Sequence, residues 1–242
     1  MSEAVPPSET SLSETPLSET LRERAGSIRT ESIQTGAIPV IALGTEVSPS
    51  ERFMAELLTG QGTRDDYTAL LAQHFFVYRA LEAAAELRAG DPVAARFISP
   101  ALTRLPAIRE DLRFLVGDDW EARIEPLETT RRYVERIETV AATSTGGFVA
   151  HHYTRYLGDL AGCQVIRTLM QRQFGFETNG VGFWLFAGIA KPKEFKSVYR
   201  AQLDSVGWTD AERQQVLDEV AVAYRLTEDM FGGLVARSAA AA

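Results

Sequence analysis

An aspartate flanked by two glycines is the feature of this sequence that most strongly suggests chemistry. Asp159 lies in the segment HHYTRYLGDLAGCQVI, residues 151–166, which otherwise has the pattern of a helix. Gly158 and Gly162 are four residues apart, so they share one face of that helix. Each glycine weakens a helix by about 1 kcal/mol relative to alanine. The two glycines therefore weaken the helix next to the carboxylate of Asp159.

Two interpretations explain this pattern. In the first, the glycines let another helix pack closely, and Asp159 is a buried polar residue with hydrogen-bond partners. In the second, a flat ligand lies against the glycine face, because glycine permits close approach to the backbone and bending of the helix. A carboxylate buried beside such a ligand would hold water as its partner.

A pair of cations elsewhere in the chain favours the ligand. Lys196 and Arg200 are four residues apart in KEFKSVYR, and like charges at that spacing on a helix repel each other unless an anion lies near both. Tyr153 precedes Asp159 by six residues on the same helix. An apolar slot with a glycine wall and a cationic rim suits a flat apolar ligand that carries carboxylate groups, and heme is such a ligand.

Composition limits the class of protein. The chain has 242 residues, which is enough for a substantial core, and its net charge of −8 argues against a nucleic acid as the main partner. A single cysteine excludes an internal disulfide framework and fits a reducing compartment. The sequence shows no apolar run of the roughly 20 residues that cross a bilayer and no signal-peptide pattern. We therefore expect a cytoplasmic protein without a membrane segment.

The periodicity predicts an all-α, single-domain bundle of several helices. Residues 1–17 are rich in Ser, Glu, Thr and Pro and are expected to form a flexible tail, residues 18–237 the helical domain, and residues 238–242 a frayed end. Thr63 and Asp66 have the spacing of a capping box at the start of a long helix. Other helices are expected at about 21–33, 108–117, 125–143 and from 209 onward, while GAIPVIALG at 36–44 reads as an extended connector or a short strand.

The segment AHHYTRYLGDLAGCQVI resembles the distal-helix signature of the biliverdin-forming heme oxygenases of bacterial type. RFMAELLTGQGTRDDYTALLAQHFFVYRALE, GIAKPKEFKSVYRAQLDS and VAVAYRLTEDMF are similar to further segments of that family in the same order. The resemblance covers about residues 52–234. It implies a heme oxygenase-like bundle that cleaves heme with O2, and with electrons from a reductase such as ferredoxin or a flavin reductase, to biliverdin, CO and ferrous iron.

The resemblance also implies roles for individual residues. Asp159 matches an aspartate that holds the water network delivering protons to bound dioxygen, and Gly158 and Gly162 match glycines that touch heme and let the distal helix flex. Arg155 matches an arginine of the same network, although a solvated arginine is the alternative. The residues that match propionate-binding or pocket-lining positions are Tyr153, Lys196, Arg200, Arg22, Met54, Tyr224 and Phe231. For the last three, ordinary core packing is the alternative.

The histidine that binds iron in the family has no counterpart here. Aligning LRERAGSIRTES with the first helix puts Arg29 at its position, and aligning backwards from Phe53 puts Thr45 there. Arginine stays protonated and a threonine hydroxyl binds iron weakly, so the axial ligand is unknown. The segment between the two alignments, which includes GAIPVIALG, looks like an insertion.

The remaining candidate ligands are few. His74 is expected to be a core or helix-surface histidine, and His151 and His152 precede Tyr153 on the distal helix, where the family also often has histidine. Cys163 replaces the second glycine of the family's usual pair. We interpret it as a small buried residue that stiffens the helix, with thiolate ligation of iron as the alternative.

Two other functions remain open. The missing histidine is also consistent with a carrier, sensor or structural partner that binds heme or another flat ligand without degrading it. An enzyme with different oxidative chemistry on the same scaffold is a third hypothesis, although the paired carboxylate–histidine helix motifs of a di-iron bundle are not evident.

These alignments generate a first prediction. The ferric complex should carry water or hydroxide rather than imidazole or thiolate, and replacing Arg29 with histidine (Arg29→His) should strengthen heme binding and move the absorption spectrum toward nitrogen ligation. A native imidazole spectrum that is lost in His74→Ala, or a thiolate spectrum that is lost on changing Cys163, would contradict it.

Overall fold

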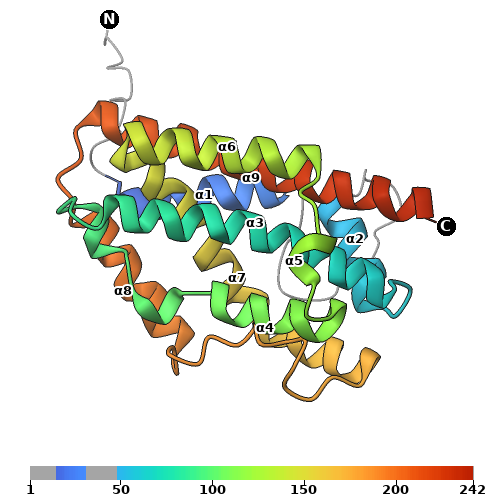
Figure 1. Ribbon diagram of the computed structural model, residues 1–242. Helices are drawn as coiled ribbons and strands as arrows, with labels where there is room; N and C mark the ends of the chain where they lie inside the picture. The colour runs from blue at the N-terminus through green and yellow to red at the C-terminus, as the bar shows by residue number, and fades with distance from the viewer. Residues whose placement is uncertain (1–14, 31–47, 242) are drawn as a thin grey trace, which may run out of the picture.

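The structure is a computed structural model that describes residues 15–30 and 48–241, and these form an all-α bundle without strands. Figure 1 shows α3, α6 and α9 running side by side along the length of the molecule. The predicted fold class is confirmed.

The helices are α1 (Leu17–Thr30), α2 (Pro49–Leu58), α3 (Arg64–Arg88), α4 (Leu105–Val116), α5 (Trp120–Arg123), α6 (Glu128–Thr143), α7 (Thr145–Phe174), α8 (Pro192–Asp204) and α9 (Asp210–Ala241), with two short 3-10 helices at Ala94–Arg96 and Pro100–Leu102.

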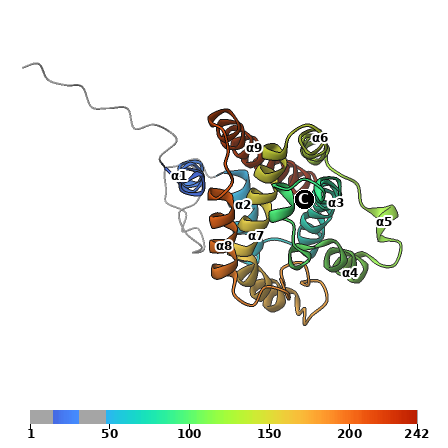
Figure 2. The same ribbon diagram turned by 90° about the vertical axis from the view of Figure 1, so that its left-hand side faces the viewer.

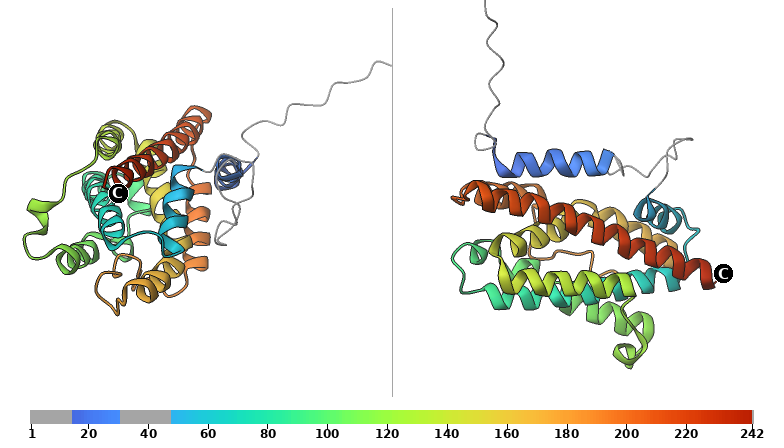
Figure 3. Two further views of the ribbon diagram at one scale, coloured as in Figure 1. Left: turned by 90° about the vertical axis from the view of Figure 1, so that its right-hand side faces the viewer. Right: turned by 90° about the horizontal axis from the view of Figure 1, so that it is seen from above.

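Helix α7 runs through the middle of the bundle, with α3 on one side and α2 and α8 on the other (Figure 3). It begins where the hydroxyl of Ser144 accepts a hydrogen bond from the Gly147 N–H at 2.9 Å. Its first turns pack tightly, because a Cβ on Gly146 would lie 3.0 Å from Val216 and one on Gly147 would lie 2.8 Å from Val140. This close packing fixes the first half of α7 against α6 and α9.

The long helix α3 follows the pattern expected from the sequence. The Thr63 hydroxyl accepts from the Asp66 N–H at 3.0 Å, and the Asp66 carboxylate accepts from the Thr63 N–H at 2.9 Å, so the predicted capping box is present. Most of α3 is buried, from Tyr67 to Ala84. Helix α3 therefore provides a fixed surface for the side chains of α7 that face α3.

The ends of the domain differ from the predicted boundaries. Leu17, which we assigned to the tail, begins α1 and is buried, and the next residue, Ser18, donates from its backbone N–H to Asp204 of α8 at 2.8 Å. Figure 2 shows α1 on the outside of the bundle, next to α8. Helix α9 continues to Ala241, so the described part of 238–242 is helical rather than frayed. Residues 1–14 of the predicted tail, and GAIPVIALG at 36–44, lie outside the described residues.

A buried carboxylate joins three helices near the start of α7. Glu219 of α9 accepts hydrogen bonds from the Nε2 of His151 at 2.8 Å and from the Nε of Arg136 at 2.9 Å. Burial alone would raise the pKa of Glu219, but these two partners outweigh it and bring the pKa to about 2. The carboxylate is therefore ionised at neutral pH and ties α6, α7 and α9 together.

A second buried contact joins α7 to α8. The hydroxyl of Tyr199 and the Nδ1 of His152 share a hydrogen bond of 2.9 Å, and the two rings are stacked with centroids 5.8 Å apart. Burial lowers the pKa of His152 to about 3. His152 is therefore neutral at physiological pH.

Buried neutral histidines predict how stability depends on pH. The pKa of His74 is about 4 and that of His152 about 3, below the ordinary 6.5. The unfolded chain binds these protons more tightly, so the free energy of unfolding should fall as pH falls from about 6.5 toward 4. His152→Gln, which keeps a hydrogen-bond partner for Tyr199, should reduce the loss between about pH 7 and pH 5 by about 1–2 kcal/mol. Urea unfolding at both pH values measures this, and parallel losses in the two proteins would refute it.

Candidate functional site

A buried polar cluster joins α3 to α7. Tyr78 donates its hydroxyl hydrogen to Asp159, and the Nη2 of Arg155 lies 3.0 Å from both oxygens of the same carboxylate. The same Nη2 donates to the Nε2 of His74 at 3.1 Å, and the Nδ1 of His74 lies 2.8 Å from the carbonyl oxygen of Leu70. Since Nε2 accepts, the proton of His74 belongs on Nδ1. All of these bonds can therefore form at once with a neutral imidazole.

The charges in the cluster are set by burial and by the ion pair. Burial would lower the pKa of Arg155, but the neighbouring Asp159 carboxylate more than offsets it and raises the pKa above its usual range. Burial and the Arg155 cation together lower the pKa of His74 to about 4. Arg155 is only 6% exposed, so it is not the solvated arginine that the sequence left open. The cluster contains one ion pair, and its other members are neutral.

A cavity of about 220 Å³, which we call the slot, opens beside this cluster. Helix α7 forms one wall, α2 and α9 form the facing wall, and α3 and Trp184 complete it. Six of the residues that the resemblance assigned to distal or pocket-lining positions lie together here, so the structure brings most of those positions into one site. The lining residues are Ser50, Met54, Leu70, His74, Thr154, Arg155, Gly158, Asp159, Ile166, Trp184, Tyr224, Thr227, Glu228 and Phe231.

The glycines of α7 distinguish the two interpretations of the sequence. A Cβ on Gly158 would meet no atom of the described residues within 4 Å, and one on Gly162 would meet only the tip of Ile166 at 3.9 Å. Close helix packing is present at Gly146 and Gly147 instead. Among the described residues, the close-packing interpretation is therefore wrong for the pair that flanks Asp159. Their face is open, as the ligand interpretation requires.

The expected propionate-binding residues lie outside the slot lining. Lys196 and Arg200 are half-buried on α8, and the Nε of Arg200 is buried without a hydrogen-bond partner among the described residues. Tyr153 is buried with its ring 6.1 Å from that of Tyr199, and Arg22 is exposed on α1. These residues lie on α1, α7 and α8, of which α8 contacts each of the other two, but their predicted role stays a prediction.

The two residues that align with the family's iron-binding histidine are not seen in the slot. Arg29 belongs to α1, but its side chain is not among the described ones, and Thr45 lies outside the described residues. Of the three histidines, only His74 lines the slot, and both of its ring nitrogens already have partners. The described residues also include no group of three or more His, Cys, Asp or Glu side chains placed to hold a metal ion.

Sequence reasoning missed three slot residues on α2 and α9, namely Ser50, Thr227 and Glu228. Glu228 lines the slot, and its carboxylate accepts from the Ser50 hydroxyl at 2.5 Å and from the Ser50 N–H at 3.2 Å. The helical period could have found Glu228, because it follows Tyr224 by four residues and precedes Phe231 by three. No local sequence pattern points to Ser50, because its partner Glu228 lies 178 residues away.

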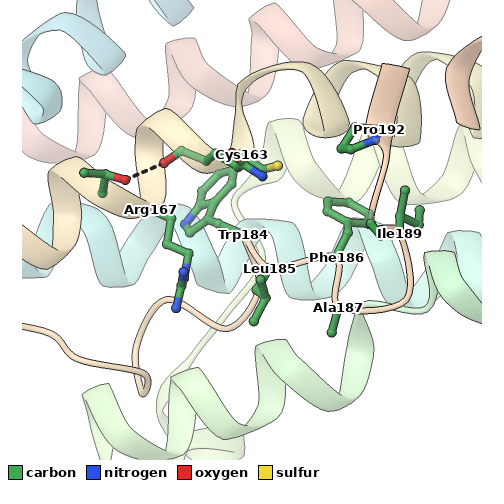
Figure 4. Close-up of a pocket in the computed structure, with 11 residues that line it drawn as sticks. Cys163, Arg167, Trp184, Leu185, Phe186, Ala187, Ile189 and Pro192 are labelled. Carbon is green, nitrogen blue, oxygen red and sulfur yellow. Dashed lines mark hydrogen bonds between the residues drawn. The ribbon is translucent and has the colours of Figure 1, made fainter. Parts of the chain in front are cut away.

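Cys163 faces a different cavity. Figure 4 shows this second space, about 390 Å³, between α7 and the loop that leads into α8. Cys163 and Arg167 contribute to it from α7, and Trp184 borders both this cavity and the slot. Burial raises the pKa of the Cys163 thiol. The thiol therefore neither lines the slot nor favours the thiolate form that iron ligation requires.

Comparisons with known proteins agree with this geometry. A family model described as "Heme oxygenase" matches residues 48–232. Heme oxygenase 1 from Homo sapiens is 37% identical over 182 residues, which is 74% of this chain and 63% of that protein. The chain thus spans just under two thirds of the length of the first vertebrate relatives it matches. Heme oxygenase 1 from Synechocystis is 31% identical and covers 75% of this chain and 76% of that protein.

Solved structures extend the similarity to the whole fold. The crystal structure of heme oxygenase-1 from the cyanobacterium Synechocystis in complex with heme matches with a TM-score of 0.78 and 28% identity, over 93% of this chain and 96% of that one. The structure of heme oxygenase from Leptospira interrogans matches with a TM-score of 0.74 and 27% identity, over 90% and 98%. No helix in the described part of the chain is long and apolar enough to cross a membrane.

The open face of α7 predicts opposite effects of alanine at two glycines. Gly158→Ala should raise the free energy of unfolding by about 1 kcal/mol, because its methyl group enters open space and alanine favours helix. Gly147→Ala is the matched control on the same helix and should lower stability, because its methyl group would lie 2.8 Å from Val140. Urea unfolding of both variants measures this. Destabilisation by Gly158→Ala would mean that the face is closed.

Proposed function

Since the chain belongs to the heme oxygenase family, we propose that it cleaves heme with O2 and external electrons to biliverdin, CO and ferrous iron. One observation carries the proposal: the buried pair of Arg155 and Asp159 borders a slot whose α7 wall bears the open face of Gly158. A carboxylate held in this way beside a flat ligand can organise water and deliver protons.

The residues of the slot fit heme in their chemistry. The open space over Gly158 admits a flat ring, and the Nε of Arg155 is buried at the slot without a partner among the described residues, which suits an ordered water. The volume of about 220 Å³ lies below the roughly 300 Å³ at which ligand pockets usually begin. Entry of heme would therefore require α7 to move away from α2 and α9, and the glycines make such bending cheaper.

Heme, once bound, supplies the oxidising chemistry itself, as cofactors of this kind do. The protein's part is to orient, to exclude bulk water and to place protons. Tyr78 and Arg155 hold the Asp159 carboxylate in one orientation, and His74 fixes the guanidinium of Arg155. A carboxylate oxygen can accept more than one hydrogen bond, so Asp159 can still bind water from the slot.

We assign the propionate contacts to the cationic rim outside the slot. Lys196 and Arg200 stand on one face of α8, and Tyr153 and Arg22 lie on the neighbouring α7 and α1. Charge-assisted hydrogen bonds are worth about 1.5–3 kcal/mol each. Several such bonds would hold heme firmly without a strong axial ligand.

Reduction of heme needs electrons from outside the chain, and we propose a ferredoxin or a flavin reductase as their source. The acidic net charge of −8 and the single cysteine fit a reducing cytoplasmic setting. A second candidate function is heme binding without turnover. It is favoured by one observation, that His74, the only histidine in the slot, is fully engaged by hydrogen bonds.

Turnover separates these two functions. Given heme, a reductase, electrons and oxygen, the native protein should lose its Soret band while a bilin spectrum grows. Asp159→Asn should still bind heme but turn over about 100-fold more slowly, the scale of effect expected when a positioned proton-transfer group is lost. The matched control is Asp229→Asn, an exposed aspartate on α9 outside the slot, which should behave like the native protein. A heme spectrum that stays stable through many equivalents of reductant would instead establish the carrier.

A further inference from the structure

We propose that Glu228 of α9 is the protein ligand to heme iron, where the sequence alone offered no ligand and led to the expectation of water or hydroxide. The inference rests on the proposed function, because it requires heme in the slot. It concerns the iron ligand, for which the sequence offered no histidine.

The packing of the helices brings Glu228 and Asp159 to the same slot from different helices. Helices α7 and α9 touch near their beginnings, where His151 meets Glu219. The slot lies further along both helices, with Asp159 on α7 and Glu228 on α9. Helix α2 completes the second wall, since the rings of Phe53 and Phe231 lie 5.9 Å apart. A flat ring in this slot can therefore be reached by one carboxylate from α7 and another from α9.

The other donors on this wall are poorer ligands for ferric iron. The hydroxyl hydrogens of Ser50 and Thr227 are committed to Glu228 and to a backbone carbonyl, and neutral hydroxyls bind iron weakly. The Met54 thioether is a soft donor, and a phenol such as that of Tyr224 must lose its proton before it binds ferric iron strongly. Glu228 offers a hard carboxylate oxygen. It therefore best matches a ferric centre.

The carboxylate is already oriented as a ligand should be. Ser50 is buried and donates two hydrogen bonds to Glu228, one from its hydroxyl and one from its backbone N–H. That N–H belongs to the first turn of α2, where backbone donors lack helical partners and the helix dipole favours negative charge. Each oxygen accepts one hydrogen bond and keeps a further acceptor site. Carboxylates that bind metals are commonly held in this way by outer-shell partners.

The experiment compares two probes that fill the same slot, ferric protoporphyrin IX and iron-free protoporphyrin IX. Glu228→Gln should lower the affinity for the ferric probe about tenfold or more and leave the affinity for the iron-free probe unchanged, because only the first contains iron. Asp229→Asn, the neighbouring exposed aspartate, is the matched control and should bind both probes like the native protein. Binding of the iron-free probe also reports that each variant is folded.

Two further variants sharpen the result. Ser50→Ala should weaken binding of the ferric probe alone and by less than Glu228→Gln, because the carboxylate remains but loses its orientation. Glu228→His should shift the ferric absorption and electron paramagnetic resonance spectra to those of imidazole ligation. A spectrum that does not change in Glu228→His would put the side chain out of reach of the iron and overturn the proposal.

The remaining outcomes separate this inference from the proposed function. If Glu228→Gln lowers the affinity for both probes equally, Glu228 contacts the porphyrin as part of the slot wall and does not bind iron. If it lowers neither affinity, Glu228 does not contact the bound porphyrin. Both results overturn the inference and leave the proposed function standing. Failure of the native protein to bind either porphyrin would overturn the proposed function, and the inference with it.

Discussion

The ion pair of Arg155 and Asp159 is the constraint on which the rest of the site depends. Two charges removed from water must find compensation, and loss of one partner from a buried pair costs about 3–5 kcal/mol. Helix α3 provides that compensation with Tyr78 and His74, which are four residues apart. The same spacing separates Arg155 from Asp159 on α7, so one turn of α3 matches one turn of α7. The registry of these two helices is therefore set by hydrogen bonds as well as by apolar packing.

The polar contacts of α7 divide the helix into two parts that are held by the rest of the bundle to different degrees. Its first half is buried and anchored, by His151 to Glu219 and by His152 to Tyr199. Beyond Asp159, residues 161–169 are mostly exposed or half-buried, and Gly162 has open space beside it. The helix is thus fixed where it must hold the carboxylate and less constrained where a ligand would enter. This division explains how one helix can both position a charge and accommodate a ring.

Local patterns in the sequence predicted much of this structure. The all-α class, the capping box at Thr63 and the grouping of Asp159 with Gly158 followed from spacing, because neighbours on one helix are fixed by its period. The contacts that sequence reasoning missed join distant segments: Ser50 with Glu228, and Arg155 with His74. Helical spacing says which face a residue occupies, but not which other helix lies against that face. The direction of Cys163 was undetermined for the same reason.

The narrowness of the slot has a kinetic consequence. A cavity of about 220 Å³ that must widen before it can hold a large ring makes access a two-step process, in which the helices separate first and the ligand follows. The association rate would then reach a ceiling at high ligand concentration, set by how often α7 moves away from α2 and α9. The same motion would also limit escape, so an enclosed ring would leave no faster than the bundle opens.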